Sequence, residues 1–254
     1  MIYKADLHIH SCLSPCASLD MSPRAIVERA AEIGLNCLAL TDHNSAGNCA
    51  TMAKFCEREG ILFFPGLEVM SAEEAHFVCL FDDVDTATAF GKIIYDSLTP
   101  VKNIPEKMGD QVYVDEDDGV VDFEEQYLGI ASGYTVDCLR ERVAYFGGLF
   151  IAAHVDKPCF SITSRLGSLN GEFSAVELSR AGALRGGYEE LTKDYTAITA
   201  SDSHYIHNIG GACIEFESDT ANIAGFARSL REGRIKMSVF DDAFRTEPGR
   251  RIRT

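Results

Sequence analysis

Short apolar runs alternate with amphipathic segments along most of the 254-residue chain. Apolar runs of about four to eight residues predict buried strands, and apolar positions that recur every three or four residues predict helices. Strands are expected at 2–8, 37–40, 61–64, 76–81, 149–153, 175–178, 197–200, 212–216 and 235–239, and helices at 24–33, 50–59, 86–95, 136–146 and 221–232. This repeated order favours an α/β fold built on a parallel sheet, either open or closed into a barrel.

The pattern predicts a single domain over residues 1–254, because α/β barrels of this length fold as one unit. The alternation is lost at about residues 98–133, where an acidic run from Asp110 to Glu125 contains no lysine or arginine. We interpret this stretch as an inserted excursion rather than a second domain. The tail at about residues 245–254 is basic, and we expect it to fray.

Composition narrows the class of protein. Hydrophobic residues make up 46% of the chain, enough for a packed core, and no apolar run approaches the roughly 20 residues that span a bilayer. Nine cysteines without a Cys-x-x-Cys pair indicate reduced thiols in a cytoplasmic protein. The formal net charge of -16 argues against a long nucleic-acid footprint, but it permits a small phosphate ester as substrate.

Six of the seven histidines stand in short polar cassettes around the apolar runs, accompanied by acidic residues. The cassettes are Asp6-Leu7-His8-Ile9-His10, Thr41-Asp42-His43-Asn44, Gly66-Leu67-Glu68, Ala75-His76-Phe77, Ala153-His154-Val155-Asp156 and Ser201-Asp202-Ser203-His204. Residues two apart in a strand point to the same side, so His8 and His10 can share one ion, as can Asp202 and His204. Histidines and carboxylates with few thiolates suit zinc, manganese or iron, and the cassettes together predict a polynuclear metal site.

The positions of the cassettes select a barrel over an open sheet. Five of them follow the C-terminal end of a different predicted strand, at His10, His43, Glu68, His154 and Asp202. Strand ends of an open sheet would not converge on one point, whereas those of a closed α/β barrel ring a single mouth, where such barrels place their active sites.

In this order the cassettes resemble the motifs of the PHP family, named for its polymerase and histidinol phosphatase domains. The resemblance runs from Asp6 to His204, and it implies a distorted seven-stranded (β/α) barrel of the TIM type with two or three divalent ions that hydrolyses phosphate esters. The resemblance further implies that a first ion is held by His8, His10, Glu68 and Asp202. Glu68 would bridge to a second ion, which His76 and His154 also hold. His43 and His204 would bind a third ion or the substrate phosphate. Glu68, His43 and His204 are therefore the candidate catalytic residues.

The chain departs from the family pattern at one place. Many members carry a further histidine or aspartate five or six residues after the second histidine, as a ligand of the third ion. Pro15 and Cys16 occupy those positions here. Either the Cys16 thiolate or the Asp20 carboxylate replaces the missing ligand, or the third site is weak.

Two further sets of residues lie close to the cassettes. Metal-bound histidines usually donate their other ring N–H to a carboxylate or a carbonyl, and the candidates for that role are Asp6, Asp42 and Asp156. Phosphate binding needs cationic donors, and the candidates that follow strand ends near His154 are Lys157, Arg165 and Arg180.

Hydrolysis of a small phosphomonoester, such as a nucleotide or a sugar or amino-alcohol phosphate, is the function that these features favour. The first alternative is stepwise hydrolysis of short oligonucleotides from the 5′ end, which the same metal site supports. A metal-dependent amidohydrolase is disfavoured, because such barrels commonly use a bridging lysine and Glu68 occupies that place here. A non-catalytic metal-binding barrel is disfavoured by the intact ligand set. The sequence indicates neither an obligate protein partner nor membrane association.

Overall fold

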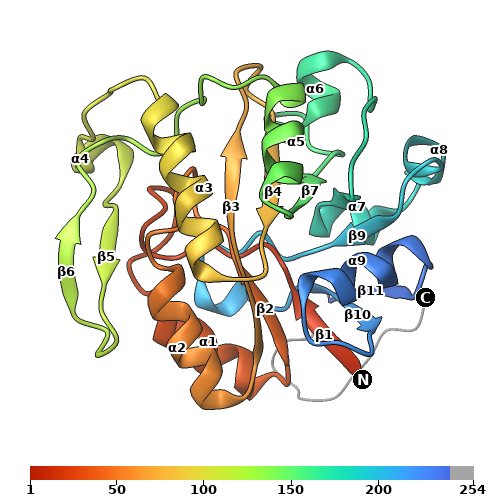
Figure 1. Ribbon diagram of the computed structural model, residues 1–254, viewed down its shortest axis with the longest axis horizontal. Helices are drawn as coiled ribbons and strands as arrows, with labels where there is room; N and C mark the ends of the chain where they lie inside the picture. Colours follow the sequence, from red (N-terminus) through yellow and green to blue (C-terminus); the bar gives the residue numbers. More distant parts are fainter. Residues whose placement is uncertain (241–254) are drawn as a thin grey trace.

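The computed structural model describes residues 1–240, which are arranged around one curved sheet of nine strands (Figure 1). The hydrogen-bonded order of the strands is β11-β10-β1-β2-β3-β4-β7-β8-β9. Their bounds are β1 Ile2–Asp6, β2 Cys37–Leu40, β3 Leu62–Met70, β4 His76–Leu80, β7 Leu149–Ala152, β8 Ala175–Leu178, β9 Ala197–Thr199, β10 Ala212–Glu217 and β11 Ile235–Val239. The basic tail predicted at 245–254 lies outside the described residues.

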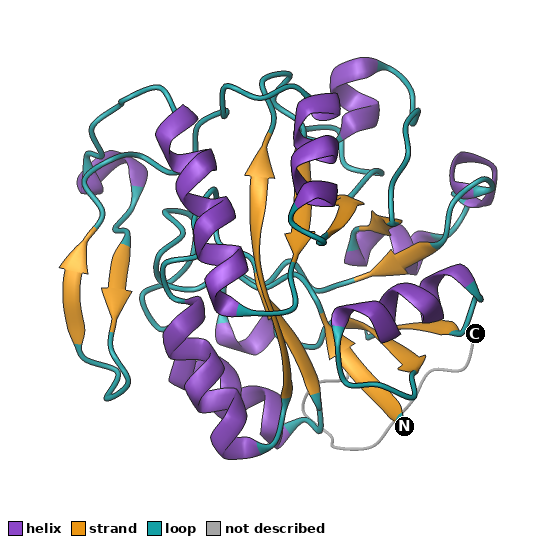
Figure 2. Ribbon diagram, in the orientation of Figure 1, coloured by secondary structure: helices purple, strands orange, loops and turns teal. Residues whose placement is uncertain are grey.

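Helices cover the outside of the sheet (Figure 2). The longer ones are α1 Pro23–Glu32, α2 Cys49–Glu59, α3 Val84–Ser97, α5 Val136–Tyr145 and α9 Ile223–Arg231, and the short ones are α4 Pro105–Met108, α6 Ile162–Leu166, α7 Arg180–Arg185, α8 Glu189–Thr192 and the 3-10 helix η1 Ile206–Asn208. Local sequence sets several boundaries. The Ser22 hydroxyl accepts a hydrogen bond from the Ala25 N–H and caps α1, with Pro23 as its first residue. Gly60, at a φ of 66°, ends α2 in the left-handed conformation.

The edge strand β9 and strand β1 approach each other at the mouth of the barrel. The segment that follows β9 pairs with the segment that follows β1, through a parallel bridge between Ile9 and Ser203. The His10 N–H donates to the Ser203 carbonyl at 3.0 Å. The prediction of a nearly closed, TIM-like α/β barrel is therefore confirmed.

The direction of the strands differs from the parallel sheet that alternation favoured. β4 is antiparallel to both β3 and β7, and β10 is antiparallel to β1 and β11. Only residues 71–75 separate β3 from β4, and a connection this short makes a hairpin instead of a helical crossover. The sheet has nine strands where the resemblance implied seven, because β10 and β11, which are antiparallel and connected through α9, extend it beyond one edge of β1.

Alternating strand residues build two cores. One cluster, which includes Ala5, Cys37 and Ala39, fills the inside of the sheet, and its neighbours in sequence pack against the helices outside. Phe226 of α9 joins the inner cluster, with ring centroids 4.8 Å from Phe216 and 5.8 Å from Phe64. Because Phe216 pairs with Tyr3 near the start of β1, α9 lies at the end of the barrel away from the mouth.

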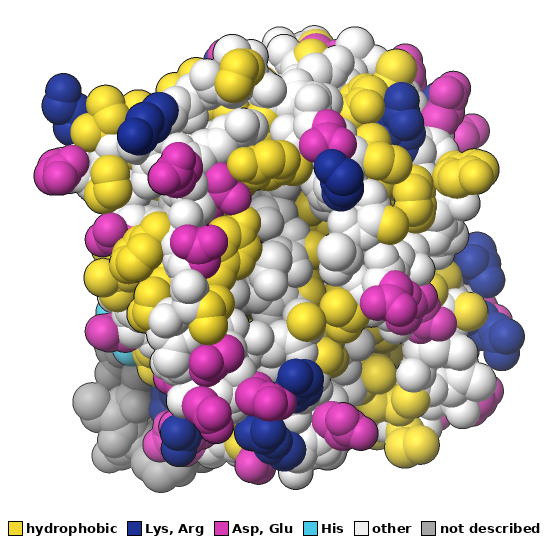
Figure 3. All heavy atoms as spheres, turned by 60° about the vertical axis from the view of Figure 1, so that its left-hand side comes forward, with side chains coloured by type: hydrophobic (Ala, Val, Ile, Leu, Met, Phe, Trp, Pro, Cys, Tyr) yellow, Lys and Arg dark blue, Asp and Glu magenta, His cyan; other side chains and the backbone are white. Residues whose placement is uncertain are grey.

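The acidic excursion contains an antiparallel hairpin of β5 Val112–Val114 and β6 Val120–Phe123, at the left edge of Figure 1. It is tied to the loop after β1, since the Val112 N–H donates to the Cys12 carbonyl at 2.9 Å. Gly109, at a φ of 97°, lies so close to the Pro15 carbonyl that a side chain would collide with it. Figure 3 is turned so that this side of the molecule comes forward, and the face that it shows mixes hydrophobic, acidic and basic side chains. Among residues 1–240 no helix has both the length and the apolarity to cross a membrane.

Candidate metal centre at the barrel mouth

The Glu68 carboxylate stands at the centre of the candidate site. The sequence predicted that Glu68 follows its strand, but in the structure Glu68 lies within β3. The Glu68 N–H donates to the Asp42 carbonyl at 3.0 Å. Three imidazoles approach Oε1: His76 Nδ1 at 2.8 Å, His154 Nε2 at 3.1 Å and His8 Nε2 at 3.3 Å. Because β4 runs antiparallel, His76 at its beginning reaches the same mouth as the ends of the parallel strands.

The second carboxylate oxygen faces another group of imidazoles. His43 Nδ1 lies 3.0 Å and His10 Nε2 lies 3.5 Å from Oε2 of Glu68. The Asp202 Oδ1 atom is 3.4 Å from His10 Nε2, and His204 Nδ1 is 3.7 Å from that same oxygen. The structure thus brings together all eight residues that the sequence nominated as ligands.

Within residues 1–240, three groups of side chains have ligand atoms that lie within 4.8 Å of one another. They are His8, His10 and Glu68; His43, Glu68 and His76; and His10, Cys16, His43 and His204. The first group matches the expected first ion, with Asp202 beside it, whereas His43 joins Glu68 more closely than the resemblance implied. Imidazole nitrogens and carboxylate oxygens are donors that zinc, manganese and iron accept.

Unpartnered ring atoms support this use. His76 Nε2 and His154 Nδ1 are buried and have no hydrogen-bond partner within the described part of the chain. Buried polar atoms are nearly always satisfied, and an absent ion is one of the recognised explanations for those that are not. The donor set therefore fits divalent metal ions.

Two carboxylates of the site have lowered pKa values. Burial raises the pKa of the Glu68 carboxyl, but the surrounding imidazoles, that of His76 first, lower it further, so the pKa lies well below its usual range. Burial also raises the pKa of Asp202, and His8 with Lys157 then holds it well below the ordinary value. Both carboxylates are consequently ionised at neutral pH and available to cations.

Strained backbone accompanies the site. His154 and Asp202 adopt left-handed conformations, with φ of 31° and 50°. Residues other than glycine rarely adopt such angles, and they cluster at functional sites where the surrounding structure enforces them. His154 comes shortly after β7, which ends at Ala152, and Asp202 comes shortly after β9, which ends at Thr199.

Glu177 on β8 supports the site and was missed by sequence analysis. Both of its carboxylate oxygens lie 3.1 Å from His8 Nδ1, and Oε1 also accepts from the His154 N–H at 3.3 Å. Burial lowers the pKa of His8, but Glu177 gives the largest opposing effect and the pKa is raised well above its ordinary value. A glutamate in the middle of a four-residue apolar strand was the available signal, because buried charges need partners.

Asp42 acts on the histidines through Ser14. The Ser14 hydroxyl donates to Asp42 Oδ1 at 2.6 Å, lies 2.9 Å from His10 Nδ1, and accepts from the His43 N–H at 3.1 Å. Ser14, like Glu177, was not singled out from the sequence. It holds two candidate ligands in place with a single hydroxyl.

Asp6 and Asp156 orient loops instead of histidine rings. Asp6 accepts backbone N–H groups of Ser201 at 3.0 Å and of Gly210 at 2.8 Å, and burial raises its pKa to about 6. Asp156 accepts the N–H and the hydroxyl of Ser179, both at 2.6 Å. These contacts fix the segments after β8 and β9, which line the mouth.

The two candidate replacements for the third-site ligand separate in space. Both residues are exposed, but Cys16 groups with His10, His43 and His204, whereas Asp20 lines a groove beside the β5–β6 hairpin. Burial raises the pKa of the Cys16 thiol, but His43 and His204 lower it more, to about 7. Among the described residues, Cys16 is therefore the better placed of the two.

The three candidate phosphate donors are engaged in different ways. Lys157 Nζ pairs with Asp202 at the centre of the site. Arg165 Nη2 pairs with Glu74 at 2.9 Å on the rim, and Arg180 Nη2 donates to the Phe240 carbonyl at 2.6 Å. Of these three contacts, that of Lys157 is with a candidate ligand.

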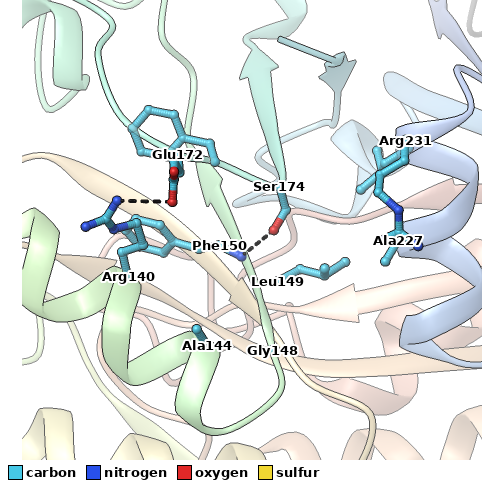
Figure 4. A pocket seen from close by; sticks show the side chains of 11 residues that line it. Arg140, Ala144, Gly148, Leu149, Phe150, Glu172, Ser174, Ala227 and Arg231 are labelled. Carbon is cyan, nitrogen blue, oxygen red and sulfur yellow. Dashed lines mark hydrogen bonds and ion pairs between the residues drawn. The ribbon is translucent and has the colours of Figure 1, made fainter.

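A separate hollow of about 350 Å³ lies between α5 and α9 (Figure 4). Arg140 and Glu172 pair across it at 3.4 Å, and Ser174 accepts from the Phe150 N–H at 3.1 Å. None of the candidate ligands lines it. It is distinct from the metal centre.

Comparison with known proteins agrees with this geometry. A family model described as PHP domain matches residues 6–206, and one described as PHP-associated matches residues 192–235. The 3′,5′-nucleoside bisphosphate phosphatase of Chromobacterium violaceum is 37% identical over 90 residues, which cover 34% of this chain and 30% of that protein.

Solved structures show the same fold at low identity. The lesion-specific endonuclease PfuEndoQ from Pyrococcus furiosus superposes with a TM-score of 0.67 at 18% identity, over 95% of this chain and 60% of that one. A two-domain protein from Bacteroides vulgatus, containing a predicted PHP-like metal-dependent phosphoesterase, superposes with a TM-score of 0.54 at 17% identity, over 94% and 65% of the two chains.

This chain spans less than two thirds of the length of these relatives. The PHP domain model nevertheless covers most of the chain, including the segment that holds every candidate ligand. The chain belongs to the PHP domain family, as the order of its cassettes predicted.

Proposed function

We propose that this protein is a metal-dependent phosphoesterase that hydrolyses a small phosphomonoester with water. The observation that carries the proposal is the Glu68 carboxylate, which has imidazoles within 3.5 Å of both oxygens, supplied by four separate segments of the barrel. No structural role requires five histidines around one buried carboxylate. Family membership supports the same reaction class.

Two or three divalent ions, zinc, manganese or iron, would occupy the three ligand groups, with Glu68 shared between the first two and Cys16 completing the third. Such ions, when bound, activate water near neutral pH and neutralise charge on a phosphoryl group. The chain's own part is to fix the donors. Glu177 and Ser14 hold His8 and His10, and both candidate carboxylates are ionised at working pH.

Substrate phosphate would be bound by the more open side chains of the mouth. The His204 side chain is 25% exposed, the most of the six site histidines, and we assign it to contact with the phosphate. The Lys157 side chain is 38% exposed, and its ammonium group would exchange its ion pair with Asp202 for one with a phosphoryl oxygen. Arg165 and Arg180 contact residues outside the ligand groups, and we assign them to any further phosphate group of the substrate.

A small substrate is favoured by charge and by the position of the hairpin. The net charge is -16, and the acidic excursion is tied to the loop that carries Cys16. Long polyanions would meet this acidic rim. The name of the Chromobacterium violaceum relative supports a nucleoside bisphosphate or a similar monoester as the substrate.

The test is phosphate release by manganese-reconstituted protein from a panel of compounds. The panel holds nucleoside mono- and bisphosphates, histidinol phosphate, sugar phosphates and 5′-phosphorylated short oligonucleotides. His8→Ala should abolish release, and His207→Ala, an exposed histidine outside the ligand groups, should retain it. Preference for oligonucleotides would favour the 5′-end nuclease alternative. No release from any compound by protein shown to hold metal would refute the proposal.

A further inference from the structure

Phe160 occupies an unfavourable position beside the metal centre. It lies in the connection between β7 and α6, its φ is 58°, and its side chain is 40% exposed. A bulky residue in the left-handed region is a genuine outlier, and an exposed aromatic ring gains little from burial. Neither local preference nor the hydrophobic core accounts for phenylalanine here.

Both the backbone and the ring of Phe160 contact His76. The Phe160 carbonyl accepts the His76 N–H at 2.8 Å, and the Ala153 N–H donates to the His76 carbonyl at 3.2 Å. The two rings stack with centroids 5.0 Å apart and planes inclined by 15°. The stacked contact therefore fixes the plane of the imidazole.

The flanks of Phe160 are anchored independently. The buried Ser161 hydroxyl donates to the Lys157 carbonyl at 2.6 Å and accepts from the Ser164 N–H at 3.1 Å. The Arg165 guanidinium lies 5.2 Å from the Phe160 ring and pairs with Glu74. The surrounding structure thus enforces the strained conformation.

His76 lacks the kind of partner that orients other site histidines. His8 is held by Glu177 and His10 by Ser14, neither of which belongs to the ligand groups. Among the described residues, the side-chain hydrogen bond of His76 is to Glu68, which is itself a candidate ligand, and His76 Nε2 has no partner. The remaining ring neighbours of His76, His43 and His154, are also site residues.

We propose that Phe160 is a positioning residue that fixes the His76 imidazole by stacking, in the place that a hydrogen-bond partner takes for His8 and His10. The inference rests on the metal centre of the proposed function. Stacking sets the ring plane while leaving both nitrogens free for Glu68 and for an ion. The left-handed backbone of Phe160 is the conformation in which its ring lies over His76.

The test is a zinc titration of the metal-free protein in competition with a chromogenic chelator. Phe160→Leu keeps apolar bulk without an aromatic face, and Phe160→Asn suits the left-handed backbone without a ring. Both should retain one zinc ion fewer at a fixed chelator concentration, with the affinity of that ion reduced about tenfold, as for other partners that orient metal-binding histidines. Phe160→Tyr should restore wild-type binding.

Controls separate positioning from folding. Phe123→Leu makes the same change at an exposed phenylalanine of β6 and should leave zinc binding unchanged. Thermal unfolding is measured on the metal-free variants. The Tm of Phe160→Asn should not be lower than that of wild type, so that unfolding does not explain its loss of zinc. Wild-type zinc affinity in both Phe160→Leu and Phe160→Asn would overturn the inference alone. A wild-type protein that binds no zinc, manganese or iron would overturn the proposed metal centre as well.

Discussion

Replacing Glu177 by glutamine, and separately by alanine, should weaken divalent metal binding in two steps. Glu177 is buried on β8, and both of its oxygens lie 3.1 Å from Nδ1 of His8. Glutamine keeps one oxygen that accepts the ring N–H, so the tautomer and the orientation of His8 survive. Alanine removes the acceptor and leaves a buried N–H without a partner.

The size of each step follows from the bonds that are lost. A hydrogen bond to a charged group contributes about 1.5–3 kcal/mol and a neutral one about 0.5–1.5 kcal/mol, so Glu177→Gln should cost about 1 kcal/mol, or about fivefold in affinity. An unpaired buried donor adds about 1–3 kcal/mol, which takes Glu177→Ala to about 100-fold. This range agrees with the about 10–100-fold effects of partners that orient metal-binding histidines.

Competition titration with zinc measures both variants against wild type. Glu217→Gln on β10 is the matched control, because it makes the same change at an exposed strand position. If Glu177→Ala binds zinc within about twofold of wild type, His8 is not held by Glu177 in the metal-bound protein and the reasoning fails.

Iodoacetamide at about pH 7.5 should label Cys16 before the other cysteines, because the pKa of Cys16 is lowered to about 7 and its thiolate predominates at that pH. Bound zinc should protect Cys16 from labelling, and equal labelling with and without zinc would exclude Cys16 from the third site. Phe226→Ala should destabilise the protein by about 3–5 kcal/mol, since the ring is fully buried against two others, and a Tm within 2 °C of wild type on a circular dichroism melt would contradict this. Replacing the four acidic residues 115–118 by their amides should raise kcat/KM for short oligonucleotides relative to monoesters at low salt, and an unchanged ratio would show that the hairpin does not exclude polyanions.

The sequence predicted the site better than it predicted the sheet. His8 and His10 indicate a metal site because two histidines stand two residues apart at the end of an apolar run, and this pattern needs no tertiary information. The direction of β4 depends instead on how the chain turns after Met70. The periodicity of an apolar run is the same in a parallel and an antiparallel strand, so His76 could be nominated at the start of its strand without knowing that this strand runs antiparallel.

Long-range partners were the hardest to predict. Asp6 and Asp156 stand beside ligand cassettes, but their carboxylates accept backbone N–H groups of distant loops, whereas Glu177 serves His8 from 169 residues away. Adjacency in sequence does not determine which residue meets a ring nitrogen across a barrel. Phe160 is a further case, because its φ and its stacking on His76 depend on how the segment after His154 returns to β4.

The hairpin of β3 and β4 has a consequence for how the protein folds. Glu68 and His76 are eight residues apart in sequence and meet within one local unit, whereas the contact of His8 with Glu177 requires the barrel to close. Local contacts form early because little loop entropy opposes them. An ion present during refolding thus meets part of its donor set before closure, and metal supply should influence the folding rate as well as the stability of the final state.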